Sequence, residues 1–279
     1  MREVDAKAIA EEVARLSVEA NYHIGSDIRE AFRRAMEYER DDVPREVLRC
    51  LLENAKIADR GKLPLCQDTG MAVVFVEIGQ DVHIAGSVED AVNEGVRRGY
   101  EEGYLRKSIV ADPVRRVNTK DNTPAVIHYK VTRGDRIRLV VAPKGFGSEN
   151  MSALSMLTPS QGLEGVKKFV LDTVDRAGPN PCPPVVVGVG VGGTMEKAAV
   201  MAKEALLRPV GTGNEDEFWD GVERALLASI NGLDIGPAGF GGVTTALAVH
   251  IRTYPTHIAG LPVAVNIGCH ATRHAEAVI

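Results

Sequence analysis

The sequence predicts a mixed α/β (α+β) fold, in which a helical N-terminal layer leads into a domain that contains both helices and strands. Two observations predict it. The first 60 residues carry apolar residues at three- and four-residue spacing, which is typical of amphipathic helices. After Gly61, β-rich runs alternate with helical stretches. We therefore expect a helical segment over residues 1–60 and a mixed α/β domain over residues 61–279, together forming one continuous structural unit.

The N-terminal segment is expected to form three helices, over residues 4–20, 26–39 and 43–58. Ser26 is suited to cap the second helix, and Pro44 fits the first turn of the third. Cys50 falls on the apolar stripe of the third helix in the stretch VLRCLLENA, so it is expected to be a small core residue.

The remaining elements follow from alternation, helical periodicity and turn residues. Strands are expected over residues 71–78, 82–85, 126–131, 136–142, 185–189, 244–251 and 261–267. Helices are expected to begin at Ser87 and to cover residues 160–176, 195–207, 215–230 and 270–277. Residues 105–124 and 143–159 are predicted to be loops. The turn-like stretch TRGD separates the third and fourth strands, which predicts a hairpin.

Composition excludes several classes of protein. The 279 residues are 44% hydrophobic and 25% charged, which is typical of a globular protein. The net charge is −5 with the two signs well mixed, so no nucleic-acid partner is expected. No stretch has the apolar length of a membrane span, and the N-terminus lacks a signal-peptide pattern. The expected location is cytoplasmic, without membrane contact.

Three of the four cysteines share a setting. Cys66, Cys182 and Cys269 each lie at the end of a predicted strand, in backbone rich in proline or glycine. Structural zinc requires four ligands, and no fourth cysteine shares the setting. Three thiolates could instead hold a [4Fe–4S] cluster with one iron open to substrate. Cys66 is directly followed by Gln67 and Asp68, an amide and a carboxylate at the same loop.

Two other motifs support different interpretations. Gly188, Gly190 and Gly193 form a G-x-G-x-x-G between a strand and a helix, as in dinucleotide-binding proteins, but no second strand ending in an acidic residue follows. A glycine loop that binds another anion, or one that is purely structural, therefore stays open. His270 and His274 have the spacing of a helical metal pair, but a solvated helix is the favoured interpretation.

A polar loop concentrates positive charge. Arginine presents a planar fork that matches carboxylates, so this loop is a candidate for binding an acidic substrate. Its basic residues are Arg106, Arg115, Arg116 and Lys120.

Four stretches together resemble a known family. PLCQDTG, KGFGSENMS, NPCPPVVVGVGVGGTMEKA and THIAGLPVAVNIGCHATRH are similar, in this order, to the N-terminal half of class I, iron–sulfur-dependent fumarate hydratases. They resemble equally the α subunit of the related L-tartrate dehydratase. The resemblance covers essentially the whole chain.

The resemblance implies a site and a cofactor. In the family, three cysteines hold a [4Fe–4S] cluster whose open iron binds substrate, which implies Cys66, Cys182 and Cys269 as ligands. Asp68 is implied as the residue that moves a proton. Substrate contacts are implied at Gln67, Arg106, Gly145 and His257. Phe146 stands where the family more often has glycine, which bears on the contact at Gly145.

The resemblance also implies a partner. Single-chain members continue into a second domain that supplies further catalytic residues, so the resemblance implies the α subunit of a hetero-oligomer with a separate β subunit. The implied reaction is the interconversion of fumarate and (S)-malate, small dicarboxylates, with dehydration of L-tartrate as the near alternative. Two alternatives of other classes remain, a nucleotide- or anion-binding module at Gly188–Gly193 and an iron–sulfur scaffold or sensor without turnover.

Overall fold

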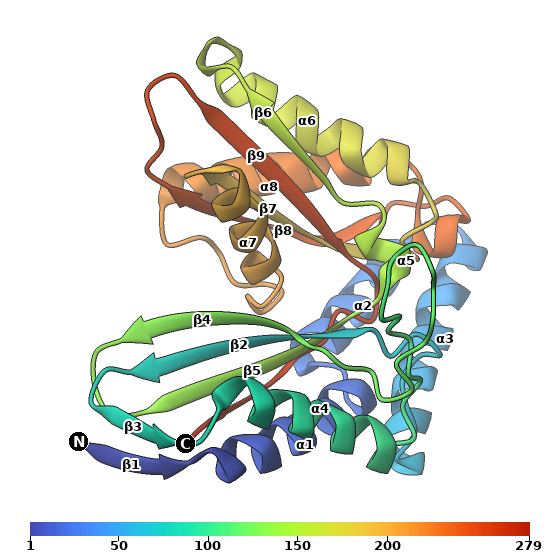
Figure 1. Ribbon diagram of the computed structural model, residues 1–279. Coiled ribbons are helices and arrows are strands. Elements are labelled where there is room, and N and C mark those ends of the chain that lie inside the picture. Colours follow the sequence, from blue (N-terminus) through green and yellow to red (C-terminus); the bar gives the residue numbers. More distant parts are fainter. The chain divides into compact units, whose positions relative to one another are not determined.

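A computed structural model describes residues 1–279 and confirms a mixed α/β fold (Figure 1). The chain forms two compact units, and neither coincides with the segments 1–60 and 61–279 expected from the sequence. The first unit comprises Met1–Gly25, Asn54–Phe146 and Arg273–Ile279. The second comprises Ser26–Glu53 and Gly147–Thr272. No helix of the chain is both long enough and apolar enough to cross a membrane.

The first unit consists of two sheets and two long helices. Its elements are β1 (Arg2–Asp5), α1 (Ala6–Tyr22), β2 (Met71–Gly79), β3 (Val82–Ala85), α4 (Val88–Glu102), β4 (Val126–Thr132), β5 (Ile137–Lys144) and β10 (Ala275–Val278). Strands β1 and β3 form a parallel pair, and the larger sheet has the order β10-β5-β2-β4. Helices α1 and α4 pack against each other so closely that a Cβ on Gly95 would lie 2.6 Å from the carbonyl oxygen of Ala10.

The hairpin expected between β4 and β5 is wrong. Strand β2 lies between them, parallel to β4 and antiparallel to β5. Residues 72–76 of β2 are all buried, and a buried strand needs hydrogen-bonding partners along both of its edges. The stretch TRGD therefore connects two strands that flank a third, and the turn residues alone do not reveal that insertion.

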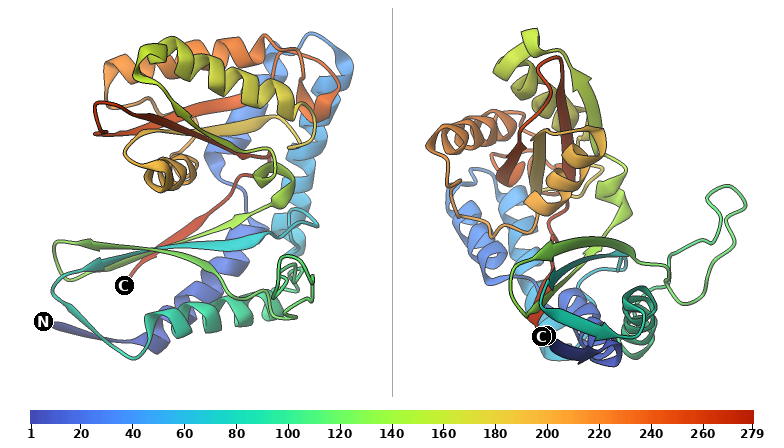
Figure 2. Two further views of the ribbon diagram at one scale, coloured as in Figure 1. Left: turned by 45° about the horizontal axis from the view of Figure 1, so that its top comes forward. Right: turned by 60° about the vertical axis from the view of Figure 1, so that its left-hand side comes forward.

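The second unit consists of one sheet with helices on both faces. Its elements are α2 (Ser26–Tyr38), α5 (Phe146–Glu149, starting at the last residue of the first unit), β6 (Ala153–Leu157), η1 (Pro159–Gln161), α6 (Gly162–Ala177), β7 (Val185–Gly192), α7 (Met195–Ala205), α8 (Glu217–Asn231), η2 (Pro237–Gly239), β8 (Ala246–Tyr254) and β9 (Leu261–Gly268). Helix α3 (Asp42–Gly61) begins in the second unit and ends in the first. The sheet has the order β6-β9-β7-β8. Helices α6 and α8 cover one face, and α7 covers the other (Figure 2, left).

Four short elements differ from expectation. Strand β1 ends at Asp5, inside the helix expected over residues 4–20. Strand β6 and helix α5 lie in the loop expected over residues 143–159, and β10 replaces the C-terminal end of the expected helix over residues 270–277. Strand β6 pairs with β9, and β10 pairs with β5. Both strands are stabilised by partners distant in sequence, which local periodicity does not report.

The glycine motif packs a helix onto the sheet. Gly188 and Gly190 lie inside β7 and not in a loop, so the interpretation of these two residues as part of a phosphate-binding loop is wrong. A Cβ on Gly188 would lie 2.1 Å from the carbonyl oxygen of Ala202, and one on Gly190 equally close to that of Ala198. The alternating valines of β7 face α6 and α8, so the glycines face α7 and let its backbone approach the strand.

Replacing Gly190 with alanine is expected to lower the free energy of unfolding by about 3 kcal/mol or more, because the methyl group has no space against helix backbone. Gly221→Ala on α8 is the control, since nothing lies within 4 Å of that Cβ and alanine favours a helix by ~1 kcal/mol. Urea unfolding of both variants checks the difference. Equal stability of the two variants would contradict the packing role.

A buried histidine makes the fold sensitive to acid. His250 on β8 is 2% exposed, and its Nδ1 lies 3.2 Å from the carbonyl oxygen of Ala205. Burial, with a smaller contribution from the charge of Arg208, lowers the pKa of His250 from 6.5 to about 4. The unfolded chain therefore binds a proton at a pH where the folded chain does not.

Stability is expected to be constant with respect to this group above pH 6.5 and to fall as the pH drops from 6.5 to about 4. The loss is ~3 kcal/mol over that interval. Unfolding measured at several pH values should show a shallower acid loss for His250→Gln, whereas His83→Gln, at an exposed histidine, should retain the full slope. If the free energy of unfolding fell equally steeply with decreasing pH in both variants, His250 would not be the source of the acid sensitivity.

Candidate functional site

The loop of residues 66–70 leads directly into β2. Gly70 has φ +72°, and a Cβ there would lie 2.7 Å from the backbone of Lys144 at the end of β5. Both the conformation and the close approach require glycine. The loop is therefore fixed against the strand neighbouring β2.

The carboxylate of Asp68 is held by backbone groups. Its Oδ1 accepts a hydrogen bond from the Gly70 N–H at 3.0 Å, and its Oδ2 accepts one from the Phe146 N–H at 2.9 Å. A Cβ on Gly145 would lie 3.1 Å from Oδ2, so glycine leaves room for the carboxylate. The structure thus brings Asp68 and Gly145 together, as expected. Phe146 contributes its backbone, while its side chain is 46% exposed.

Cys66 and Gln67 lie on the open side of this loop. The Asp68 N–H lies 3.5 Å from the Cys66 Sγ, and the Cys66 Sγ lies 3.3 Å from the Gln67 Oε1. Gln67 is exposed and Cys66 is partly exposed. An accessible thiol, an amide and an oriented carboxylate are therefore adjacent.

Arg273 fixes the loop from the buried side. It is 6% exposed, and its Nη2 donates to the carbonyl oxygen of Asp68 at 2.7 Å. Its Nε and Nη2 also donate to the Oδ1 of fully buried Asn21, at 3.3 and 3.1 Å. Through Arg273, the backbone of Asp68 is thus connected to α1 and to the segment before β10.

Two further buried side chains bind the backbone of the loop. The Tyr100 hydroxyl donates to the carbonyl oxygen of Thr69 at 2.7 Å, and the Asn122 Nδ2 donates to that of Gly70 at 3.2 Å. Burial raises the pKa of Tyr100 well above its usual range, so its hydroxyl remains a donor. The hydroxyl of Thr69 donates to the carbonyl oxygen of Arg106 at 3.0 Å. The structure therefore places the backbone of Arg106 beside the loop and leaves its side chain exposed.

Cys182 and Cys269 lie at one end of the sheet in the second unit. Cys182 precedes β7, Cys269 follows β9, and β7 and β9 are antiparallel with Val186 opposite Gly268. The carbonyl oxygen of Cys182 accepts hydrogen bonds from the backbone N–H and the Nδ1 of His270, at 3.2 and 3.1 Å. The structure thus brings the segments of these two thiols together.

Cys182 has a strained backbone. Its φ is +56°, in the left-handed region that non-glycine residues rarely adopt. Such conformations concentrate at functional sites, where the surrounding structure imposes them. The side chain of Cys182 is exposed, and that of Cys269 is partly exposed. Neither cysteine is part of a disulfide.

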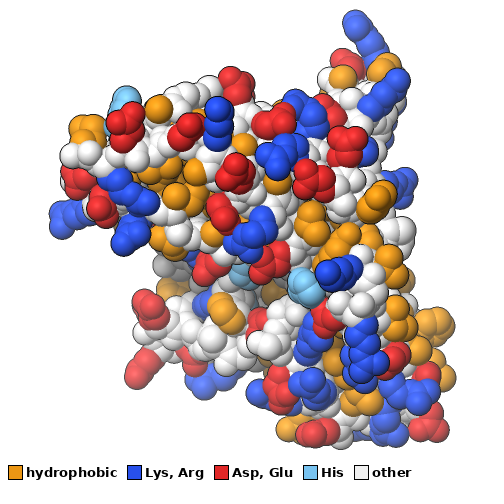
Figure 3. Space-filling model, turned by 90° about the horizontal axis from the view of Figure 1, so that it is seen from below, with side chains coloured by type: hydrophobic (Ala, Val, Ile, Leu, Met, Phe, Trp, Pro, Cys, Tyr) orange, Lys and Arg blue, Asp and Glu red, His pale blue; other side chains and the backbone are white.

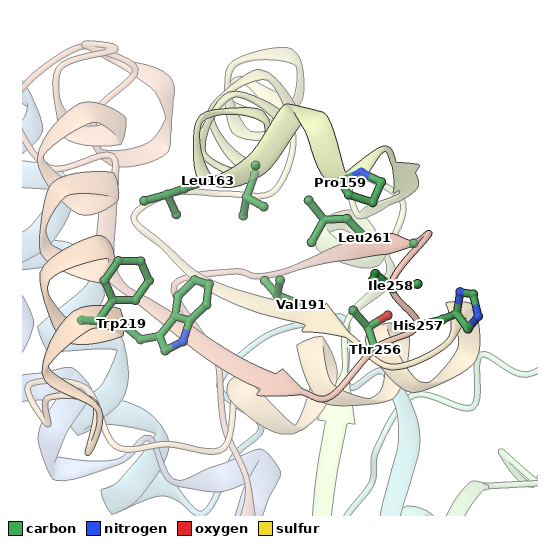
Figure 4. A pocket seen from close by; sticks show the side chains of 12 residues that line it. Pro159, Leu163, Val191, Trp219, Thr256, His257, Ile258 and Leu261 are labelled. Atoms are coloured by element: carbon green, nitrogen blue, oxygen red, sulfur yellow. The ribbon is translucent and has the colours of Figure 1, made fainter.

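His257 lies at the opposite end of the same sheet. It belongs to the loop between β8 and β9, which follows the end of β8, where Tyr254 pairs with Gly192. Cys269 instead follows the last residue of β9, at the other end of that strand. Eight extended residues span ~25 Å, so the structure does not bring His257 together with the two thiols of its unit. It lines a cavity of about 420 Å³ instead (Figure 4).

Two expectations are wrong in detail. Cys50 is exposed on α3 and is not a core residue, and its Sγ lies 3.6 Å from the Glu46 Oε1. His270 and His274 do not share a helix, because residues 270–271 form a turn and residues 272–274 have no regular secondary structure before β10. Arg115 and Arg116 lie on an exposed extension of the first unit.

Sequence reasoning missed the buried polar residues that hold the loop. Arg273 stands four residues after Cys269, in the stretch CHATRH that the motif analysis quoted, and this proximity is the signal that could have found it. Asn21 and Tyr100 lie on the apolar faces of α1 and α4, where only their polarity marks them. Asn122 carries no local signal.

The donor set fits an iron–sulfur cluster. Within either unit, no three side chains of His, Cys, Asp and Glu form a metal-binding group. Cys66 belongs to the first unit, and Cys182 and Cys269 belong to the second. None of the three cysteines is part of a disulfide, and each is at least partly exposed, so their thiolates are available as the soft ligands that suit iron–sulfur clusters. The Asp68 N–H lies 3.5 Å from the Cys66 Sγ, where it favours the thiolate form.

Fold and site together define a mixed α/β protein that carries thiols and a fixed carboxylate on loops at strand ends. The family model of fumarate hydratase (Fumerase) matches residues 10–278. The chain therefore belongs to the fumarate hydratase family, a family of lyases.

Two kinds of relative show the same relationship. A putative L(+)-tartrate dehydratase subunit alpha of Methanocaldococcus jannaschii is 41% identical over 274 residues, which cover 96% of each chain. L(+)-tartrate dehydratase subunits alpha of Escherichia coli, strains UTI89 and K12, are 30% identical over 269 residues, covering 95% of this chain and 88% of theirs.

Proposed function

We propose that the chain is the α subunit of a [4Fe–4S] hydro-lyase that interconverts fumarate and (S)-malate. The observation that carries the proposal is the Asp68 carboxylate, oriented by two backbone N–H groups and directly adjacent to an accessible thiol. Membership of the fumarate hydratase family supports it.

Cys66, Cys182 and Cys269 are the proposed cluster ligands. When bound, the cluster supplies one open iron, a Lewis acid that polarises a hydroxyl group of the substrate. The carbonyl oxygen of Cys182 accepts two hydrogen bonds from His270, which help to hold that ligand segment in its left-handed backbone conformation. The remaining thiol, Cys50, lies on an exposed helix and has no part in the proposal.

Asp68 is the proposed proton donor or acceptor. Its Oδ1 and Oδ2 each accept only one backbone hydrogen bond, and a carboxylate oxygen has two lone pairs, so each oxygen can also exchange a proton with the substrate. Arg106 is proposed to bind a carboxylate group of the substrate through its guanidinium, and Gln67 to hydrogen-bond it. His257 is left out of this set, because it lies at the far end of the sheet from Cys182 and Cys269.

A β subunit is the proposed partner. Adding water across a double bond requires both a proton donor and a proton acceptor, and Asp68 supplies one of them. The relatives named as α subunits support a two-subunit enzyme.

L-Tartrate is the second candidate substrate. The relatives at 41% and 30% identity are named as tartrate dehydratase subunits, which is the observation that favours it. Tartrate differs from malate by one further hydroxyl group, so the same carboxylate-binding residues serve both.

The test is anaerobic reconstitution of the chain with iron and sulfide, alone and with a candidate β subunit. We expect about four irons per chain, no turnover by the chain alone, and turnover of (S)-malate by the assembly. The ratio of kcat/KM for (S)-malate and L-tartrate decides between the substrates. A cluster without turnover of either acid would support the scaffold interpretation, and full activity of the chain alone would remove the β subunit from the proposal.

A further inference from the structure

A projecting arm, residues 109–119, extends from the first unit between α4 and β4 (Figure 2, right). Its two sides are joined by hydrogen bonds from the Thr119 N–H to the Ile109 carbonyl at 2.9 Å and from the Ala111 N–H to the Val117 carbonyl at 2.7 Å. At the tip, Asp112 Oδ1 accepts from the N–H groups of Val114 and Arg115, at 2.9 and 2.6 Å. The arm is thus internally bonded.

The arm exposes apolar and basic side chains next to each other, which suits binding to another protein surface. Val114 is 84% exposed and Val117 is 63% exposed, next to Arg115 and Arg116, which are also exposed. Figure 3 shows Lys and Arg side chains at the tip of the projection at upper right, while the two charge signs are interspersed over the rest of that face. Arginine is enriched among the side chains that anchor protein interfaces, and the exposed valines add apolar area that a partner surface would remove from water.

The cavity lined by His257 offers a complementary surface in the second unit. It has a volume of about 420 Å³ and lies between the starts of α6 and α8 and the loop before β9. Leu163 and Trp219 lie on one side of it, and Ile258 lies on the other (Figure 4). Ile258 is 90% exposed and the neighbouring Phe218 is 58% exposed, so apolar surface continues out of the cavity.

Acidic residues border this apolar surface. Glu215 and Glu217 are exposed and directly precede Phe218 and Trp219 at the start of α8. The charge of this border is opposite to that of the arm tip, and its apolar lining matches the exposed valines. Charge complementarity of this kind fixes the partner and the register of an interface.

We propose that the arm of one copy of this chain docks in the cavity of a second copy. Val114 enters the apolar cavity, and Arg115 and Arg116 lie against Glu215 and Glu217. Each copy carries both surfaces, so a two-fold symmetric dimer makes the contact twice. The contact does not depend on the catalytic assignment.

The test is a reciprocal charge exchange in the full chain, with the dimer measured by sedimentation velocity. The variants are R115E/R116E on the arm and E215R/E217R at the cavity, with Asp216 kept because it caps α8. Each variant alone is expected to weaken the dimer about tenfold or more, since like charges then face each other. An equimolar mixture of the two variants is expected to recover dimer, because both contacts of the mixed dimer again join opposite charges.

A matched control is R133E/R136E, which makes the same charge change at exposed residues of the turn between β4 and β5. It is expected to leave the dimer unchanged. A monomeric wild-type chain would overturn the proposal, and so would a dimer that both charge variants leave intact or a mixture that fails to recover. Loss of β-subunit binding in R115E/R116E, with the dimer unaffected, would assign the arm to that subunit instead.

Discussion

Replacing Cys182 with serine is expected to prevent the chain from retaining a [4Fe–4S] cluster and to abolish hydro-lyase activity. A serine hydroxyl is a poor ligand for iron compared with a thiolate, and three thiolates leave no spare. Cys66→Ser and Cys269→Ser should behave alike. The measurement is iron and acid-labile sulfide per chain after anaerobic reconstitution, together with the visible absorbance of the cluster.

Cys50→Ser is the matched control, because Cys50 is the fourth thiol of the same chain and lies exposed on α3. It should retain about four irons and four sulfides. If Cys50→Ser lost the cluster, or if any of the other three variants kept it with full activity, the assignment of ligands would be wrong.

Replacing Asp68 with asparagine is expected to lower kcat by roughly 10²- to 10⁴-fold while the chain stays folded. The amide is close in shape to the carboxylate but cannot exchange a proton at neutral pH. It can also accept from only one of the two N–H groups, those of Gly70 and Phe146, that orient the native side chain. Activity of the assembled enzyme, with cluster content measured in the same sample, separates lost catalysis from lost cofactor.

Asp216→Asn is a matched control, since Asp216 also accepts two backbone hydrogen bonds, from Phe218 and Trp219. Asparagine caps a helix as well as aspartate does, so stability and activity should stay unchanged. Activity of Asp68→Asn within threefold of the native enzyme would exclude proton transfer by Asp68.

Local sequence patterns predicted those elements whose stability is largely local. The helices that became α1, α2 and α3 follow from apolar spacing, and β3 was expected over the residues it occupies. Pairing was not accessible in the same way. Strands β6 and β10 exist because β9 and β5 offer them free edges, and β2 separates two strands that the sequence presents as a hairpin.

The candidate site likewise has one part that the sequence predicts and another part that only the folded chain reveals. Cys66, Gln67 and Asp68 are consecutive, so sequence alone places them together. Arg273 and Asn21 are 252 residues apart, and only the folded chain shows that they hold the Asp68 backbone. Cys50 was wrongly predicted to be a core residue. The apolar spacing defines one face of the helix, but it does not show which part of that face packs against other elements.

The three-segment construction of the first unit sets an order of folding. Strand β10 completes its sheet, yet residues 147–272 of the second unit stand between it and its partner β5. On the ribosome, β5 therefore keeps one edge unpaired until the whole second unit has been synthesised. An unpaired strand edge is a template for aggregation, and contacts between such distant residues form slowly. The partly made chain thus exposes an edge of β5 that the finished fold pairs with β10.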